Sequence, residues 1–250
     1  MSVVTLAGIL LGTFLISIAI VRGGSALIFI NIDAAFITVG GTIAATLIAY
    51  PFKDVRRVFH VALNAFKKDI YPPSQFITTI LNLAHIYRRG GLKKLETEEE
   101  SLNNRFLRTG VELVVDGFEH KDVHAILEKE RVYFSLRHES GEMIIRTMAK
   151  LAPAFGMAGT LIGLIQMMAV LNDPHNIGRP LAQAMISTFY GLLLSNLVLL
   201  PIAAKLKTRT DNELVLMRVI MDGISGIHAK ENPIRLERHL NSILPPNQRT

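Results

Sequence analysis

Hydroxyl and small side chains recur at helical spacing in two long apolar segments of this chain. These residues, three or four positions apart, are Pro153, Gly156, Thr160, Gly163 and Met167 in the first segment and Thr188, Gly191 and Ser195 in the second. Residues at such spacings share one face of a helix. Their hydroxyl oxygens could replace water around a cation and so line an ion path. The same pattern also serves close packing of membrane helices, and the spacing alone leaves both interpretations open.

A cation path along this face would lack a negative charge. Residues 151–171 and 181–204 contain no Asp, Glu, Lys or Arg. Burying an unpaired charge in hydrocarbon costs several kcal/mol even after the surroundings relax. The membrane-adjacent carboxylate is Asp33, whose position is more typical of a solvated loop or an N-cap than of a deep ion ligand. If ions cross here, we therefore expect the carboxylate that binds them to come from another chain.

Four stretches are long enough to hold these residues inside a membrane, since a hydrocarbon core of ~30 Å requires roughly 20 apolar residues. They are residues 3–21, 34–52, 149–171 and 181–204. The first has no basic start and no small-residue cleavage site before Arg22, so we interpret it as a retained span and not as a signal peptide. Half of all residues are hydrophobic. The sequence therefore predicts an all-α integral membrane protein with four transmembrane helices.

Basic residues set the expected orientation. Residues 53–150 hold 17 Lys and Arg, the tail from residue 205 holds 8, and only Arg22 and Arg179 lie in the short connections. Because basic loops stay in the cytoplasm, both termini are predicted to be cytoplasmic. This topology accounts for the net charge of +6, and a nucleic-acid partner is not expected because acids are interleaved with the basic residues. The absence of cysteine excludes disulfides and thiolate metal sites.

The predicted domains are a membrane hairpin (residues 1–52), a helical cytoplasmic insert (53–148), a second hairpin (149–204) and a helical cytoplasmic tail (205–250). Within the insert we expect one helix to end at Gly90-Gly91, another to cover residues 105–116 before Gly117, and a third to cover 121–138. Pro153 and Pro201 each lie about one turn inside the cytoplasmic end of a span. Proline removes a helix hydrogen bond, so we expect a kink at both.

The insert carries a cluster of charges on either side of its glycine pair. Its members are Arg88, Arg89, Lys93, Lys94, Glu96, Glu98, Glu99 and Glu100. This cluster is either a solvated surface with weak ion pairs or a docking surface for a partner of complementary charge. His120 and His124 have the spacing of helical metal ligands but no third ligand, so no metal site is expected. No phosphate-binding loop or hydrolase motif occurs, and nothing indicates an enzyme.

Several segments match one known family in order and in topology. They are residues 151–164 (LAPAFGMAGTLIGL), 188–191 (TFYG), 194–196 (LSN), 201–203 (PIA), 220–223 (IMDG), 115–117 (VDG) and Gly40-Gly41. Over essentially its whole length, the chain resembles the flagellar motor stator A subunits, the MotA/PomA family. It is most similar to the PomA and MotP-like branch.

This resemblance implies a homopentamer in the bacterial inner membrane around two copies of a MotB/PomB-type single-span partner, which brings the ion-binding Asp. Ion flow would turn the ring, and the insert would push the rotor switch ring. No cofactor is implied beyond the transported Na⁺ or H⁺. By motif matching, Arg88, Arg89 and Glu96 take the rotor-contacting positions, and Pro153 and Pro201 couple ion passage to movement. The ion pathway would comprise Thr160, Thr188, Gly156, Gly163 and Ser195.

The chain departs from the family pattern at two positions. Asn31 stands where many relatives have an acid, and Lys150 stands where a PomA-like chain would carry Asp. Thr160 together with Thr188 favours sodium over the proton, because a bare cation needs oxygen ligands whereas a proton needs only the acid.

Two alternatives to a stator subunit remain. One is an ExbB/TolQ-type energy-transducing proton channel subunit, although those proteins have three spans and a different insert. The other is a non-conducting membrane scaffold, whose small residues would serve only helix packing.

Overall fold

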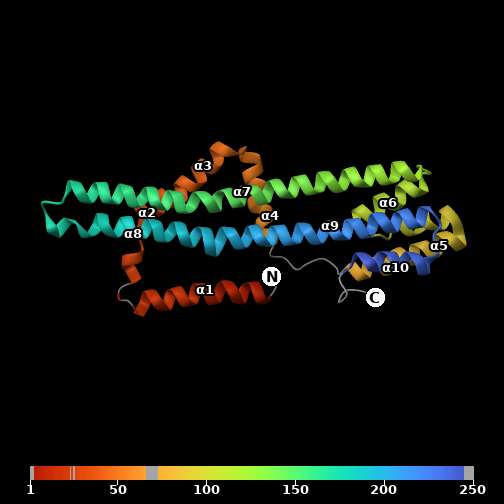
Figure 1. The fold of residues 1–250 in the computed structure, drawn as a ribbon, viewed down its shortest axis with the longest axis horizontal. Coiled ribbons are helices and arrows are strands. Elements are labelled where there is room, and N and C mark those ends of the chain that lie inside the picture. The colour runs from red at the N-terminus through yellow and green to blue at the C-terminus, as the bar shows by residue number, and fades with distance from the viewer. Residues whose placement is uncertain (1–2, 23, 25, 66–72, 245–250) are drawn as a thin grey trace. The chain divides into compact units, whose positions relative to one another are not determined.

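A computed structural model describes residues 3–22, 24, 26–65 and 73–244 (Figure 1). Every regular element within these ranges is a helix, which confirms the predicted all-α class. The chain divides into two compact units. The apolar unit comprises residues 1–68 and 139–207, and the polar unit comprises residues 69–138 and 208–250. Two long helices, α7 and α9, contribute residues to both units.

The apolar unit is built from long helices interrupted by short irregular turns. Its elements are α1 (Val3–Arg22), η1 (Ala26–Phe29), α2 (Ile32–Ala35), η2 (Phe36–Gly40), α3 (Gly41–Ala49), α4 (Phe52–Ala65), residues 139–169 of α7 (His120–Ala169), η3 (Pro174–Asn176), α8 (Gly178–Leu193), η4 (Leu194–Leu199) and the start of α9 (Leu200–His228). The turns η1 and η3 are tight 3₁₀ turns, whereas η2 and η4 are wide π-type turns.

Three helical stretches in the described part of the chain are long and apolar enough to cross a membrane. They are Ala26–Ala49, His120–Ala169 and Gly178–His228. The first predicted span, residues 3–21, coincides with α1. The side chains of residues 3–7, 9 and 10 in that helix lie outside the described part, and Leu11–Arg22 is a shorter apolar helix.

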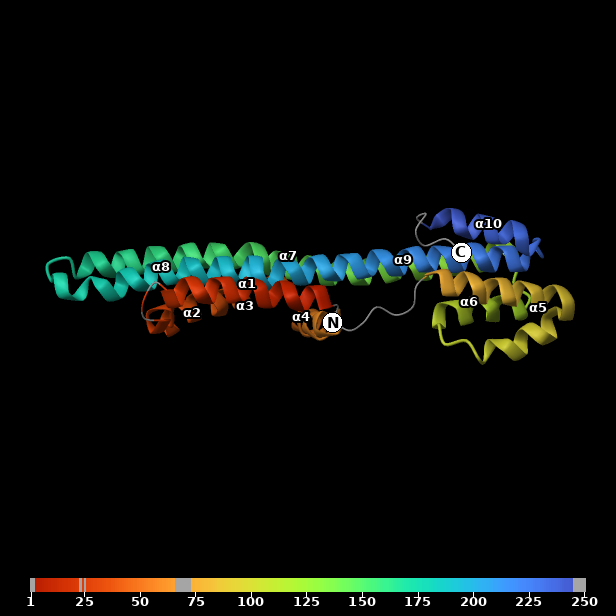
Figure 2. The same cartoon turned by 90° about the horizontal axis from the view of Figure 1, so that it is seen from below.

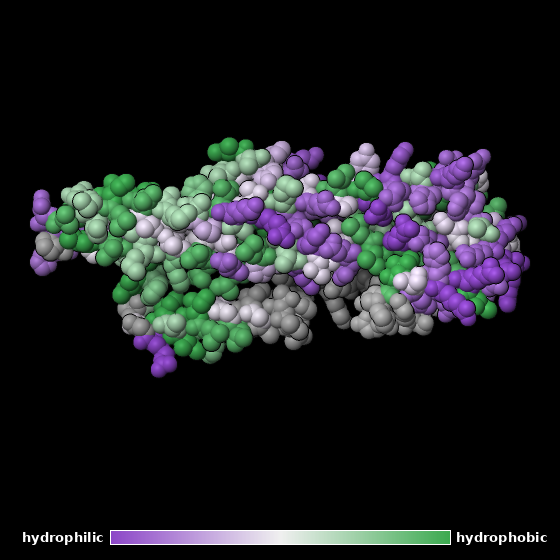
Figure 3. Space-filling model, in the orientation of Figure 1, coloured by the Kyte–Doolittle hydropathy of each residue, from purple (hydrophilic) through white to green (hydrophobic). Residues whose placement is uncertain are grey.

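The helices of the apolar unit expose large hydrophobic side chains (Figure 3). Met157, Leu161 and Ile165 on α7 are 60%, 62% and 69% exposed, and Met185 on α8 is 69% exposed. Such a surface is costly in water but suits lipid or another apolar protein face.

The buried core of the apolar unit joins α4 to α7 and to the start of α9. Its buried members are Val55, Val58, Ile144, Ile145, Met148, Ala149, Ala152, Leu199, Ala203 and Leu206. Pro201 is the second residue of α9, directly after the wide turn η4. Pro153 lies inside α7, which continues through it as one helix.

The predicted end of a helix near His138 is wrong, because α7 runs from His120 to Ala169 without interruption. Gly141 is the one weak helix former in this stretch, and a single glycine costs a helix only about 1 kcal/mol. The ion pair between Arg146 Nε and Glu142 Oε1, 2.6 Å long, spans one helical turn there. Such pairs at a spacing of four support a helix.

The polar unit packs parts of five helices around one core. These are α5 (Pro73–Glu99), α6 (Arg105–Val115), residues 120–138 of α7, residues 208–228 of α9 and α10 (Pro233–Ile243). Its fully buried side chains with less than 2% exposure include Ile77, Ile80, Leu95, Leu107, Leu127, Ile220, Met221, Ile224, Ile227 and Leu236.

Two of the helix ends predicted for the polar unit are confirmed. Gly91 has φ 69° and ψ −166°, so it interrupts α5 next to Gly90. Asn104 caps α6, since its Oδ1 accepts a hydrogen bond from the Leu107 amide at 2.9 Å. That helix ends at Asp116 and Gly117, whose φ is 79°. Glycine fits there because this region of φ is strained for residues with a β-carbon.

Candidate ion path and charged surface

Helices α7 and α8 lie side by side in both ribbon views (Figures 1 and 2) and contact each other backbone to backbone. A β-carbon added to Gly156 would lie 3.0 Å from the Ser187 carbonyl oxygen, and one on Gly163 would lie 2.7 Å from the Pro180 carbonyl oxygen. Both glycines are buried. They therefore form part of the helix contact itself, as the packing interpretation of their spacing predicts.

Thr160 and Thr188 meet across this contact. Their hydroxyls are hydrogen-bonded to each other. Thr160 Oγ1 also lies 3.0 Å from the Ala184 carbonyl oxygen and 3.2 Å from the Gly156 carbonyl oxygen, and Thr188 Oγ1 lies 3.4 Å from the latter. These two hydroxyls and two carbonyls are called the oxygen cluster below. Each hydroxyl has only one hydrogen to donate, so the four oxygens together present more acceptors than donors.

Both threonines of the oxygen cluster are half-buried. It carries no formal charge. Neutral oxygens replace part of the hydration shell of a cation, but they do not balance its charge in an apolar medium. A path along α7 and α8 therefore still needs a carboxylate from outside these two helices.

Ser195 lies away from the oxygen cluster. It follows Thr188 by seven residues, or about 10 Å along a helix. Its Oγ donates to the Ala149 carbonyl oxygen at 2.7 Å, and the residue is 4% exposed. The hydroxyl thus joins η4 to α7 inside the core.

Three buried threonines of the second apolar stretch were not singled out from the sequence. Thr38, Thr42 and Thr46 are all 0% exposed. Thr38 Oγ1 donates to the Ser187 carbonyl oxygen at 3.2 Å, while Thr42 and Thr46 donate to the carbonyl four residues earlier at 2.6 and 2.7 Å. Their spacing of four residues was the available signal. Within this threonine ladder, Thr38 joins η2 to α8 at Ser187, the residue that precedes Thr188.

The two polar positions that open α2 have structural roles. Asn31 caps α2, because its Oδ1 accepts a hydrogen bond from the Ala34 amide at 2.9 Å. Tyr190 of α8 donates its hydroxyl to the Phe29 carbonyl at 2.5 Å and accepts from the Asn31 amide at 3.2 Å. Asp33 is exposed and lies 3.9 Å from the Arg179 guanidinium, which is a long, solvated ion pair.

The charged surface of the polar unit lies on either side of the break in α5. Arg88 and Arg89 are exposed before Gly91, and Glu96 is exposed after it. Among the described residues, none of these three side chains takes part in an ion pair. Within the described part of the chain, this surface therefore presents exposed charges of both signs that are free to meet solvent or a partner.

Negative charge accumulates on the acidic half of this surface. Burial raises the pKa of Glu99, and the nearby carboxylates of Glu112, Asp116 and Glu96 raise it further, while Arg108 opposes them. A carboxylate with several acidic neighbours gains from an external cation. The acidic half is thus suited to a partner that supplies positive charge.

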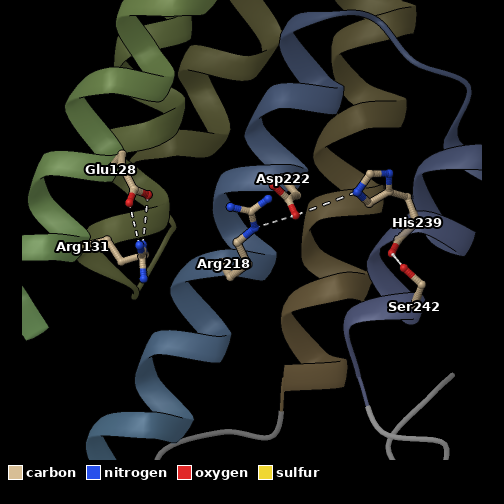
Figure 4. A network of polar contacts seen from close by, with 6 residues as sticks. All are labelled: Glu128, Arg131, Arg218, Asp222, His239 and Ser242. Atoms are coloured by element: carbon tan, nitrogen blue, oxygen red, sulfur yellow. Dashed lines mark hydrogen bonds and ion pairs between the residues drawn. The ribbon is translucent and has the colours of Figure 1, made fainter.

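The polar unit has further polar contacts within its helices and one between α9 and α10 (Figure 4). Asp222 on α9 pairs with Arg218 at 3.0 Å, and its Oδ2 lies 3.8 Å from His239 Nε2 on α10. Glu128 and Arg131 pair within α7 at 2.5 Å. In the described part of the chain, no group of three or more His, Cys, Asp or Glu side chains could hold a metal ion.

Comparisons with known proteins agree with this architecture. The model of the MotA/TolQ/ExbB proton channel family matches residues 98–219. Over 249 residues the chain is 36% identical to the chemotaxis protein PomA of Vibrio alginolyticus, covering 100% of this chain and 98% of PomA. The resemblance drawn from the sequence motifs is confirmed by these matches.

Two solved structures share the fold. The flagellar MotAB stator complex from Bacillus subtilis matches with a TM-score of 0.90 and 28% identity, over 98% of this chain and 96% of that one. The structure of C. jejuni MotAB matches with a TM-score of 0.92 and 24% identity, over 99% and 97%.

Proposed function

The chain belongs to the MotA/PomA branch of the MotA/TolQ/ExbB proton channel family, and we propose on this premise that it is a flagellar motor stator subunit. In this role it converts ion flow across the bacterial inner membrane into torque on the rotor switch ring. The single observation that carries the proposal is the oxygen cluster of Thr160 and Thr188, which gathers ligands for a cation between two membrane-length helices but includes no acid.

The missing carboxylate comes from a partner of the MotB/PomB type, whose single membrane helix carries an Asp. The exposed apolar side chains beside the oxygen cluster, Met157, Leu161 and Met185, support an apolar helix as the neighbour. The similar structure from Bacillus subtilis is described as a flagellar MotAB stator complex. We propose the same kind of assembly here, with five copies of this chain around two copies of the partner.

The charged surface of α5 is proposed to contact the rotor through Arg88, Arg89 and Glu96. Residues 53–148 then form the rotor-interaction domain, and both chain termini lie in the cytoplasm. Pro153 and Pro201 are proposed to couple ion passage to movement. The wide turn η4 directly before Pro201 supports this role, because π-type turns are frequent at functional sites and loosen the local hydrogen bonding.

The function is tested by producing the chain with its natural single-span partner in a bacterium that lacks all other stators. Rotation of tethered cells is expected in the presence of both chains and not with either alone. A chain that reaches the membrane together with its partner but restores no rotation would contradict the proposal.

Sodium is proposed as the driving ion. Replacing sodium with potassium at constant ionic strength and pH is expected to stop rotation, since the larger ion fits oxygen ligands placed for sodium less well and the proton alone does not drive the motor. Tethered-cell rotation in the two media measures this effect. Undiminished rotation without sodium would reject sodium in favour of the proton.

Reversing the charge of Arg88 or Glu96 is expected to lower motility without lowering the amount of protein in the membrane. Each exposed charge contact is worth up to about 1 kcal/mol, or roughly five-fold in binding. Swimming speed and immunoblots of membranes measure the two quantities. Lys129→Glu, an exposed charge reversal on α7, is the matched control. Full motility of the double variant Arg88→Glu, Glu96→Lys would show that this surface is only solvated.

A further inference from the structure

The turn between α9 and α10 contains a lysine where glycine is the usual residue. Lys230 has φ 53°, and it is the one residue other than glycine with a positive φ in the described part of the chain. Its amide bonds the Ile227 carbonyl at 2.9 Å, and the next amide, of Glu231, bonds the Gly226 carbonyl at 2.9 Å. This is the hydrogen bonding of a helix end that favours glycine in the left-handed position.

The backbone at Lys230 is therefore strained relative to glycine, because its β-carbon lies close to a carbonyl oxygen in this conformation. Comparable positions at the other helix breaks of the polar unit, Gly91 and Gly117, are glycines. Strained residues of this kind persist where the side chain has a task. The side chain of Lys230 consequently needs its own explanation.

The ammonium group of Lys230 lies over an aromatic ring of a different helix. Its Nζ is 5.4 Å from the centroid of the Tyr87 ring, within the range of a cation–π contact. Tyr87 is half-buried and packs against the core of the polar unit. The ring is thus held by the core, and it fixes the end of a lysine that is itself exposed.

Tyr87 directly precedes Arg88 and Arg89 in α5. The contact with Tyr87 therefore brings the Lys230 ammonium to the segment of α5 that carries the two arginines. Arg88, Arg89 and Lys230 are all exposed, and none is in an ion pair among the residues that the structure describes. Two elements far apart in the sequence thereby contribute exposed positive charges to the same region of the polar unit.

We propose that Lys230 is a third cation of the rotor-contacting surface, positioned by Tyr87 to bind a carboxylate of the rotor together with Arg88 and Arg89. This inference rests on the proposed stator function. The proposed partner is an acidic protein surface and not an anionic lipid surface. Glu96 and Glu98 are exposed on α5, the helix of Arg88 and Arg89, and a uniformly negative membrane would repel them. A protein can instead present both signs of charge in register.

Replacing Lys230 with glycine separates a binding role from a structural one. The variant relieves the strained backbone, so its thermal stability and its amount in the membrane are expected to equal or exceed those of the wild type. It also removes the ammonium, so torque is expected to fall by about three-fold, the size of one exposed charge contact. Lys230→Arg retains the cation and is expected to retain torque.

Two further variants make the test specific. Lys230→Asn is a second neutral replacement that tolerates this backbone region, and it should behave like Lys230→Gly. Tyr87→Phe preserves the ring and should rotate normally, whereas Tyr87→Leu releases the ammonium and should lose torque. All are measured by tethered-cell rotation in the stator-deficient bacterium that also produces the single-span partner.

The outcomes distinguish this inference from the proposed function. If the wild-type chain fails to restore rotation, the stator function itself fails. If the wild type rotates and Lys230→Gly rotates equally fast at equal membrane levels, the inference is overturned and the stator function stands. Loss of both Lys230→Gly and Lys230→Asn from the membrane would also overturn the inference, because that loss would reveal a structural role for Lys230. If the Lys230→Gly variant rotated normally but less of its complex stayed in the membrane, the surface would be assigned to lipid headgroups.

Discussion

Replacing Gly191 with alanine is expected to separate α7 from α8 and to destabilise the protein. The new β-carbon would lie 2.6 Å from the Ala152 carbonyl oxygen and 3.1 Å from Pro153 Cα. Both contacts are with backbone, so no side-chain rotation relieves them. Overpacking of this kind costs about 1–3 kcal/mol, and each kcal/mol lowers the Tm of a chain of this size by roughly 2–4 °C. Thermal unfolding of the purified complex in detergent measures the change.

Gly178→Ala is the matched control for this prediction. Gly178 is the first residue of α8, and nothing lies within 4 Å of its added β-carbon. Alanine also has a higher helix propensity than glycine, so this variant should unfold at the wild-type temperature or slightly above it. If Gly191→Ala retained the wild-type Tm, α7 and α8 would not approach as closely as described, and the geometry of the oxygen cluster would be incorrect.

Replacing Thr160 or Thr188 with valine is expected to abolish most ion flow while leaving assembly intact. Valine has nearly the same shape but lacks the hydroxyl that contributes to the oxygen cluster. A hydrogen bond or ligand contact to a charged group is worth about 1.5–3 kcal/mol, which corresponds to roughly a ten-fold to hundred-fold loss of ion occupancy. Sodium uptake into vesicles that contain the complex, and rotation of tethered cells, measure the loss.

Thr42→Val is the control for the hydroxyl variants. Thr42 is also buried in the apolar unit, but its hydroxyl donates only to the Thr38 carbonyl of its own helix. Such a bond within one helix contributes little to stability or to function, so rotation should persist. Normal rotation in both Thr160→Val and Thr188→Val would support the alternative of a scaffold, in which small and hydroxyl residues serve only packing.

Some regular features of the fold were predictable because they depend on neighbouring residues. Gly91 and Gly117 mark helix ends through local backbone preferences, and the structure has a break or an end at each. Thr160 and Thr188 could be selected as a pair because each lies on the face of small residues that packs two membrane helices together. Their direct contact is the tertiary consequence of that packing.

Other features depend on contacts between distant segments. The threonine ladder was missed because Thr38 bonds to a carbonyl of α8 that lies 149 residues later in the chain. The continuity of α7 past His138 results from ion pairing and packing that outweigh one glycine. Nothing in the local sequence around Lys230 indicates that its ammonium lies over Tyr87. In the proposed assembly the acid that completes the ion path belongs to another chain, so this sequence does not contain it.

The wide turn η4 also changes the helical phase between α8 and the first residues of α9. A π-type turn contains one residue more than an α-helical turn, and one residue corresponds to a rotation of about 100°. A regular helical wheel extended from Thr188 through residues 194–199 would therefore assign Pro201 and its successors to the wrong side. Alignments that place a one-residue gap in this segment would represent a real change in helical phase between Thr188 and Pro201.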